Sequence, residues 1–228
     1  MEFLTELHVH TSQVSKCSKI SVEELVEAYI QKGYATLVIT DHYNAYNFGR
    51  IGDISWQEKN DIFLSAYETA KKVANGRINI ILGMEYRNNN SLNDYLVFGV
   101  TEEFIRENNT DDDHNTLDMN LKDFTNLAHE NNMLVFQAHP FRDAMKIINP
   151  AYVDGIEVLN GHPGQISRND FALMWAEKYN LLRCAGSDCH DLSSVATTAI
   201  VTDFAITNNE DLIAVLKNSP LIKDMSEK

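Results

Sequence analysis

Apolar runs of strand length alternate with segments of helical period along almost the whole chain. This alternation is typical of α/β folds, in which strands and helices follow one another. Several runs are apolar throughout, as expected of strands that are covered on both faces. The pattern predicts strands over residues 4–10, 36–40, 78–84, 95–100, 134–138, 155–159, 183–186 and 198–202.

The segments between these runs carry helix signals. Ser21 and Glu24 form a capping box, which predicts a helix that begins there, runs to about Lys32 and ends at Gly33. Further helices are predicted over residues 57–74, 121–131, 169–179 and 209–217. Residues 102–120 are polar and acidic, and we interpret them as a solvated loop or a weak helix without a chemical role.

The number of predicted strands bounds the fold. Seven or eight strands with intervening helices in 228 residues favour a compact, irregular (β/α) barrel of parallel strands. A doubly wound open sheet is the alternative, and it differs in strand order, which the pattern does not reveal. Internal repeats, low-complexity runs and Pro/Gly-rich linkers are absent, so we expect a single domain over residues 1–228.

Composition and charge exclude some classes of function. The 19 Lys and Arg against 33 Asp and Glu give a formal charge of -14, which argues against general nucleic-acid binding but permits a local basic pocket. We expect a cytoplasmic protein without membrane attachment, because the sequence shows neither a basic, apolar leader nor a run approaching the roughly 18 apolar residues of a membrane span. Cys17, Cys184 and Cys189 form no CxxC pair, which suits a reducing compartment.

Histidines and acids gather where the predicted strands end. The carboxyl ends of parallel strands share one face of an α/β fold, and functional sites are built on that face. Five of the eight histidines lie at such ends together with acidic residues. These strand-end residues are His8, His10, Asp41, His42, Glu85, His139, Asp188 and His190.

The spacing of these residues indicates a metal site. His8 and His10 are two residues apart, so in a strand they project the same way and can bind one ion together. Asp188 and His190 repeat this arrangement. Imidazoles mixed with carboxylates suit Zn, Mn or Fe, whereas an all-oxygen set would favour Mg or Ca.

Each motif alone also has a purely structural interpretation. Asp41 could be a helix N-cap, and Glu85 could pair with Arg87. Five such coincidences at five strand ends nevertheless favour a metal site.

Other residues are candidates for binding substrate. His162 follows the strand over 155–159 and could contact substrate or serve only in a loop. Arg142, three residues after His139, and Arg168, where the helix over 169–179 starts, could bind a phosphate or be ordinary surface arginines.

Taken in order, the strand-end motifs resemble those of the PHP family, named for polymerase and histidinol phosphatase. The matching residues span about 4 to 202. The resemblance implies a distorted (β/α)7 barrel with two or three divalent ions at its C-terminal face, and phosphoester hydrolysis. The motifs are His8-x-His10-Thr11, Ile39-Thr40-Asp41-His42, Gly83-Met84-Glu85, Ala138-His139-Pro140, Gly155-Ile156-Glu157-Val158 and Gly186-Ser187-Asp188-x-His190.

The resemblance also implies how the metal ligands are shared. The first ion would be held by His8, His10, Glu85 and Asp188. Glu85 would bridge to a second ion that His139 also binds, and His42 and His190 would hold a third.

The chain departs from the family pattern at two places. Many members have a His or Asp several residues after the first motif, where this chain has Cys17, and a His in the strand after the glutamate, where Asp94 begins the strand. Asp94 and Cys17 are therefore candidate replacements.

Such a centre would hydrolyse a small phosphorylated substrate without a protein nucleophile. A water that bridges two ions loses its proton near neutral pH and attacks phosphorus. Asp188 and His190 are candidates for handling the proton, with Glu85 at the bridge. Hydrolysis of an amide or another carbonyl derivative by the same centre is the alternative, and a noncatalytic accessory module is the third interpretation.

Overall fold

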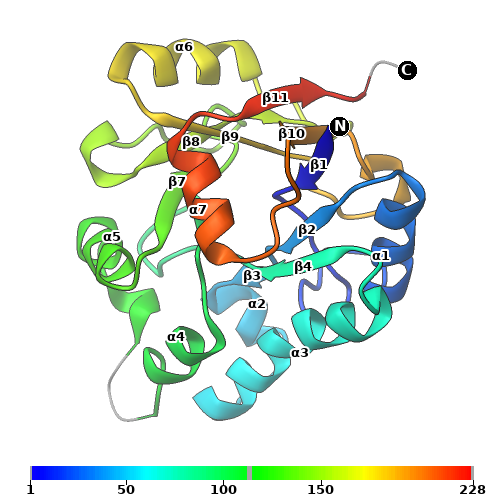
Figure 1. Ribbon diagram of the computed structural model, residues 1–228. Helices are drawn as coiled ribbons and strands as arrows, with labels where there is room; N and C mark the ends of the chain where they lie inside the picture. Colours follow the sequence, from blue (N-terminus) through cyan, green and yellow to red (C-terminus); the bar gives the residue numbers. More distant parts are fainter. Residues whose placement is uncertain (1, 112–114, 227–228) are drawn as a thin grey trace.

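The structure is a computed structural model that describes residues 2–111 and 115–226. Its strands form two sheets, with helices packed on their outer faces (Figure 1). The strands are β1 (Phe3–Glu6), β2 (Thr36–Ile39), β3 (His42–Tyr43), β4 (Asn79–Leu82), β5 (Met84–Tyr86), β6 (Tyr95–Phe98), β7 (Leu134–Gln137), β8 (Gly155–Asn160), β9 (Leu182–Gly186), β10 (Thr198–Thr202) and β11 (Leu221–Asp224). The α-helices are α1 (Val22–Gln31), α2 (Ala45–Gly49), α3 (Trp56–Ala74), α4 (Glu102–Glu107), α5 (Leu121–Glu130), α6 (Asn169–Tyr179) and α7 (Asn209–Lys217), and single 3-10 turns cover Thr116–Asp118, Pro150–Tyr152 and Leu192–Ser194.

The two sheets join into a barrel. One sheet has the order β11-β10-β1-β2-β4 and the other has the order β3-β5-β6-β7-β8-β9. At one seam only Gly83 separates β4 from β5, and a Cβ there would lie 2.9 Å from Val38 Cγ1. At the other seam the chain after β1 pairs with the chain after β9 through a parallel bridge between Val9 and Cys189. The predicted distorted α/β barrel is thus confirmed, with β10 beside β1 and β11 at the edge beside β10.

The expectation that all strands are parallel is wrong. β6 runs antiparallel to both β5 and β7, and β10 runs antiparallel to β1. The connection from β5 to β6 covers only residues 87–94 and contains no helix, so it can join two strands only as a hairpin. Tyr95 consequently pairs with Tyr86 and Gln137, which puts the start of β6 at the barrel end where β5 and β7 finish.

Two predicted strands are shorter than their apolar runs. The run over 4–10 forms β1 only as far as Glu6, because the carboxylate Oε1 of Glu6 accepts from the backbone N–H groups of Leu7 and His8 at 3.0 and 2.9 Å and replaces the sheet partner. The run over 78–84 divides at Gly83 into β4 and β5.

The predicted helices are confirmed, including the capping box of Ser21 and Glu24 at the start of α1. Helix α2 and strands β3 and β11 were not anticipated. Within 102–120, α4 and a 3-10 turn form, whereas residues 112–114 lie outside the described part of the chain. Across the described residues, the helices lack the combined length and apolar character that a bilayer crossing needs.

A buried apolar cluster underlies the strand ends that carry the candidate ligands. It takes side chains from neighbouring positions around the barrel, so it ties the strands to one another. Its members include one residue from each of β2, β4, β6, β7 and β9 and one that follows β1: Val38, Ile81, Leu96, Phe136, Cys184 and Leu7.

Candidate metal centre

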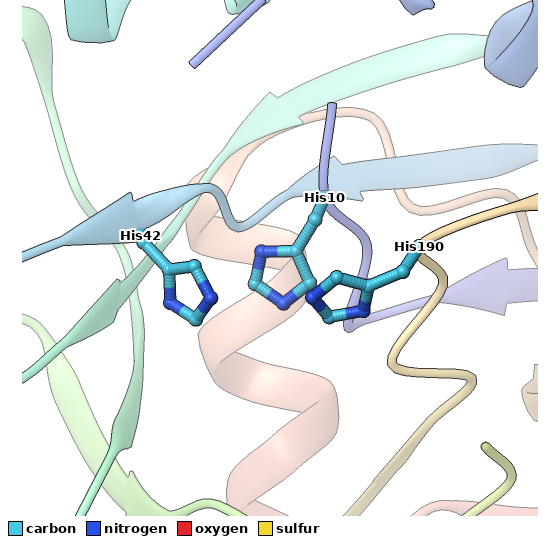
Figure 2. Close-up of side chains that lie close together, drawn as sticks. All are labelled: His10, His42 and His190. Atoms are coloured by element: carbon cyan, nitrogen blue, oxygen red, sulfur yellow. The ribbon is translucent and has the colours of Figure 1, made fainter. Parts of the chain in front are cut away.

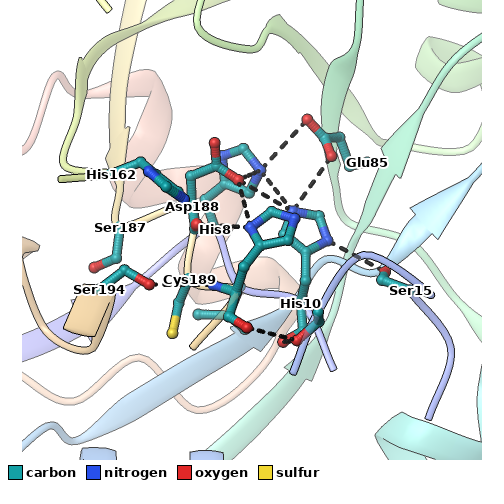
Figure 3. A network of polar contacts seen from close by, with 12 residues as sticks. His8, His10, Ser15, Glu85, His162, Ser187, Asp188, Cys189 and Ser194 are labelled. Atoms are coloured by element: carbon teal, nitrogen blue, oxygen red, sulfur yellow. Dashed lines mark hydrogen bonds and ion pairs between the residues drawn. The ribbon is translucent and has the colours of Figure 1, made fainter. Parts of the chain in front are cut away.

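Four of the predicted ligands converge on one point inside the barrel mouth (Figure 3). His8 Nε2 lies 3.1 Å from His10 Nε2, 3.4 Å from Glu85 Oε1 and 3.5 Å from Asp188 Oδ1. Two nitrogens bound to one tetrahedral zinc ion are separated by about 3.4 Å, given bonds of about 2.0 to 2.1 Å. The spacing of these donors therefore matches a shared cation.

Glu85 lies between this group and two further imidazoles. Its Oε1 is 3.0 Å from His139 Nε2, and its Oε2 is 2.8 Å from His42 Nδ1. Burial alone would raise the pKa of Glu85, but His42 and His8 hold it well below its ordinary value. The two carboxylate oxygens thus face different imidazoles, as a carboxylate that bridges two ions must.

Buried polar atoms without hydrogen-bond partners indicate whether this site suits a metal ion. Among the described residues, Glu85 Oε2, His42 Nδ1 and His139 Nδ1 are buried without a hydrogen-bond partner. Glu85 Oε2 and His42 Nδ1 approach each other closely, yet their orientation does not make a hydrogen bond. A buried polar group left unpaired costs about 1 to 3 kcal/mol, so this arrangement is expected of groups that share a cation. The donor set fits divalent metal ions.

A second cluster consists of His10, His42 and His190 (Figure 2). The ring of His10 is 4.4 Å from that of His42 and 4.3 Å from that of His190, between centroids. Burial, with His190 and His42 nearby, holds the pKa of His10 well below its ordinary value, so its neutral ring has a lone pair for a metal. Cys17 lies beside this cluster: burial tends to raise its pKa, but contacts with His190 and His42 lower it to about 6.

Asp94 is brought to the edge of the centre by the antiparallel β6. Its buried carboxylate has Oδ2 3.9 Å from His139 Nε2. Arg87 holds both oxygens of Asp94, with Nε and Nη2 donating at 2.6 and 2.7 Å. The interpretation of Arg87 as a partner for Glu85 is thus wrong, because Arg87 and Asp94 face each other across the β5–β6 hairpin. Ligation of a metal by Asp94 stays a prediction.

Two of the three predicted substrate residues lie beside the cluster. Arg142 is largely buried and forms an ion pair with Asp188, while its Nε has no hydrogen-bond partner among the described residues. The ring of His162 is 5.9 Å from that of His190, between centroids.

Arg168 has other partners. Its guanidinium donates to the Phe141 carbonyl at 2.8 Å and pairs with Asp143 at 2.7 Å. These contacts tie the start of α6 to the loop after β7. A phosphate-binding role for Arg168 remains a prediction.

Sequence reasoning did not assign a role to Glu157. This residue is fully buried on β8, and its Oε1 accepts from His8 Nδ1 at 2.8 Å while Oε2 accepts from the His139 backbone N–H at 2.8 Å. Burial would lower the pKa of His8, yet Glu157, Asp188 and Glu85 raise it well above its ordinary value. Glu157 therefore orients His8 so that Nε2 faces the centre. A lone acid within an otherwise apolar strand was the signal for such a role.

Asp41 supports His10 in a similar way, through Ser15. Asp41 Oδ1 accepts from Ser15 Oγ at 2.6 Å and from the Thr11 backbone N–H at 2.7 Å, and Ser15 Oγ lies 3.3 Å from His10 Nδ1. The N-cap interpretation of Asp41 is wrong, because Asn44 caps α2. Asp41 instead links the loop after His10 to the strand end that bears His42.

The barrel carries several buried clusters of imidazoles and carboxylates at its mouth, which is the arrangement of a metal-binding protein. The PHP domain family matches residues 6–211, so this chain belongs to the PHP family. No curated protein is significantly similar to the chain in sequence.

Solved structures share the fold at low sequence identity. PsfC from Pseudomonas syringae PB-5123 has a TM-score of 0.67 at 14% identity, over 93% of this chain and 88% of its own. A candidate metal-dependent phosphoesterase from Bifidobacterium adolescentis has a TM-score of 0.51 at 12% identity, over 94% and 96%. An amidohydrolase from Chromobacterium violaceum, with bound sulfate and no metal, has a TM-score of 0.54 at 14% identity, over 98% of each chain.

Proposed function

We propose that this protein is a metal-dependent phosphoesterase that hydrolyses a small phosphorylated substrate. The observation that carries the proposal is the convergence of His8, His10, Glu85 and Asp188, whose donor atoms lie within 3.5 Å of His8 Nε2. Family membership adds support, because it connects this arrangement with metal-dependent hydrolysis.

The metal ions proposed for this centre are Zn, Mn or Fe, held by residues that sequence and structure bring together. Bound ions of this kind activate water near neutral pH and offset the charge that builds on a reacting phosphate. Glu85, with an oxygen toward each side, would keep two ions adjacent. The proposed ligands are His8, His10, His42, Glu85, Asp94, His139, Asp188 and His190.

Asp188 and His190 are the residues that we propose for proton transfer. His190 Nδ1 lies 2.9 Å from the Asp188 backbone carbonyl, so donation there leaves Nε2 free on the cluster side. Burial would raise the pKa of Asp188, but His8, His10 and Arg142 hold it well below its ordinary value. Asp188 is therefore an anion at neutral pH. We propose that His190 passes a proton to the leaving oxygen when its Nε2 is not bound to a third ion, so the two proposed roles of His190 are alternatives.

The negative charge of the chain and of the site repels a phosphate unless cations are bound at the centre. The chain has a formal charge of -14, and Glu85, Asp188 and Glu157 are all buried at the centre. Arg142 is a permanent cation that contacts Asp188, and its planar guanidinium can bind two phosphate oxygens at once. Bound metals and Arg142 together would reverse the local repulsion of a phosphate dianion.

A substrate panel tests this proposal. Metal-free protein would be loaded separately with Zn, Mn or Fe and assayed on phosphomonoesters, phosphodiesters and amides, with Asp188→Asn as the inactive control. We expect turnover of phosphoesters that depends on metal and is lost in the control. Turnover of amides alone would show that the centre hydrolyses carbonyl derivatives and not phosphoesters. Full metal loading without any turnover would support the third interpretation, a noncatalytic accessory module.

A further inference from the structure

Helix α6 presents large apolar side chains to solvent. It packs on β8 along the outside of the barrel, and its fully buried residues are the small Ala172 and Ala176 (Figure 1). On its outer side, Phe171 and Met174 are 51% and 63% exposed, and Leu173 is 38% exposed. A surface helix normally turns its large apolar side chains to the core and its polar ones to water. The outer face of α6 therefore has the composition of a contact surface.

Exposed apolar side chains are concentrated in this part of the chain. Among the described residues, eleven large apolar side chains are exposed, and five of them lie within residues 166–179. The other six are scattered singly along the sequence, as is ordinary for a protein surface. A contiguous group of exposed apolar side chains marks an interaction site, and α6 carries most of this one.

Charged residues on the same face indicate that the partner is a second copy of the chain. Asp170, Met174 and Lys178 are exposed and spaced four residues apart, so they lie in one row along α6. Met174 is the midpoint of this row and also of the helix, which covers Asn169–Tyr179. If two α6 helices pack antiparallel about a twofold axis at Met174, Asp170 of each copy faces Lys178 of the other. The face is thus complementary to itself in charge.

We propose that the protein forms a twofold-symmetric dimer through the outer face of α6, with Met174 at the axis and Asp170 paired with Lys178 of the second copy. A membrane surface is a poorer partner, because the chain has a formal charge of -14 and anionic lipids would repel it. A helix of 11 residues is about 16 Å long, so the interface is small and the Kd is expected to be on the order of micromolar. This dimer requires neither bound metal nor catalysis.

Sedimentation velocity of the full-length protein, at concentrations from about 1 to 100 μM, covers the range of such a Kd. We expect the mass of the wild type to rise from 25.9 kDa toward twice this value. Met174→Glu brings two like charges together at the axis and should stay monomeric. Phe204→Glu is the matched control, because Phe204 is also exposed, at 46%, but lies between β10 and α7. The control should dimerise as the wild type does.

Two charge reversals test the antiparallel register. Asp170→Lys and Lys178→Asp each create two like-charge contacts in a dimer, so each variant alone should dimerise roughly 10-fold more weakly than the wild type. In an equimolar mixture of the two variants, each contact of a mixed dimer again joins a lysine to an aspartate. The mixture should therefore recover wild-type dimerisation, and so should the double variant.

A wild type that is monomeric at every concentration would overturn the proposal, as would a dimer that survives Met174→Glu. Failure of both the mixture and the double variant to recover dimerisation would refute the pairing of Asp170 with Lys178, and with it this interface. All substituted side chains are exposed, so the variants are expected to fold, and circular dichroism verifies this.

Discussion

Replacing Glu157 by Gln should weaken metal binding although Glu157 is not itself expected to bind metal. The carboxylate accepts three bonds: from His8 Nδ1 at 2.8 Å, from the His139 backbone N–H at 2.8 Å and from Asn160 Nδ2 at 3.0 Å. A glutamine keeps the shape but turns one oxygen into an NH₂ donor. That donor must face either His8 or the two donors from His139 and Asn160.

Both orientations of the glutamine are unfavourable. If its NH₂ faces His8 Nδ1, the proton of His8 moves to Nε2, which removes the lone pair that would bind metal. If it faces the other side, donors oppose donors in a buried place. Loss of an outer-shell partner weakens metal binding about 10- to 100-fold, which corresponds to about 1.4 to 2.7 kcal/mol.

Competition with a fluorescent chelator would measure zinc affinity for wild type and Glu157→Gln, with circular dichroism to verify folding. Asp154→Asn is the matched control, because Asp154 also accepts from an imidazole and a backbone N–H, those of His129 and Val135. The control should retain zinc affinity. Unchanged zinc affinity in Glu157→Gln would refute the argument that Glu157 orients His8.

Four further outcomes are expected. Asp188→Asn should abolish hydrolysis in steady-state assays while circular dichroism stays unchanged, because it removes a charged ligand without changing volume. Anomalous scattering should locate at least two ions per chain with Glu85 between them; one fully occupied peak with Glu85 turned away would contradict this. Asp94→Ala should contain less metal than the wild type when both are measured by mass spectrometry. Full metal content with full activity would exclude Asp94 as a ligand. Arg142→Ala should lower kcat/KM for the best phosphoester on the order of 100-fold, with Arg142→Lys between it and the wild type and metal content unchanged, whereas equal kcat/KM would place Arg142 outside catalysis.

The sequence predicted the elements well wherever local chemistry decided them. The capping box at Ser21 set the start of α1, and fully apolar runs became β2, β6 and β7. The failure at residues 4–10 came from a tertiary contact, since Glu6 bonds its own following backbone and also Ser187 from the end of β9. No local pattern reports a partner so distant in sequence.

The antiparallel direction of β6 explains why Asp94 reaches the site. A rule for parallel strands places residues that precede a strand at the opposite end of the barrel from Glu85. The short, helix-free connection over 87–94 reverses β6 and returns Asp94 to the same end. The length of that connection was readable from the sequence, so the antiparallel β6 was predictable, whereas the ion pair of Asp94 with Arg87 depended on side-chain geometry.

Metal binding and folding are linked in this centre through charge. Glu85, Asp188 and Glu157 are buried together, and burial of carboxylates is unfavourable unless cations accompany them. Burial alone would lower the pKa values of His8 and His42, but the adjacent carboxylates raise both well above their ordinary value, so without metal these rings carry protons. A divalent ion that displaces those protons supplies the compensating charge at the same place. The buried carboxylates that destabilise the metal-free barrel mouth are thus among the groups that would bind the metal.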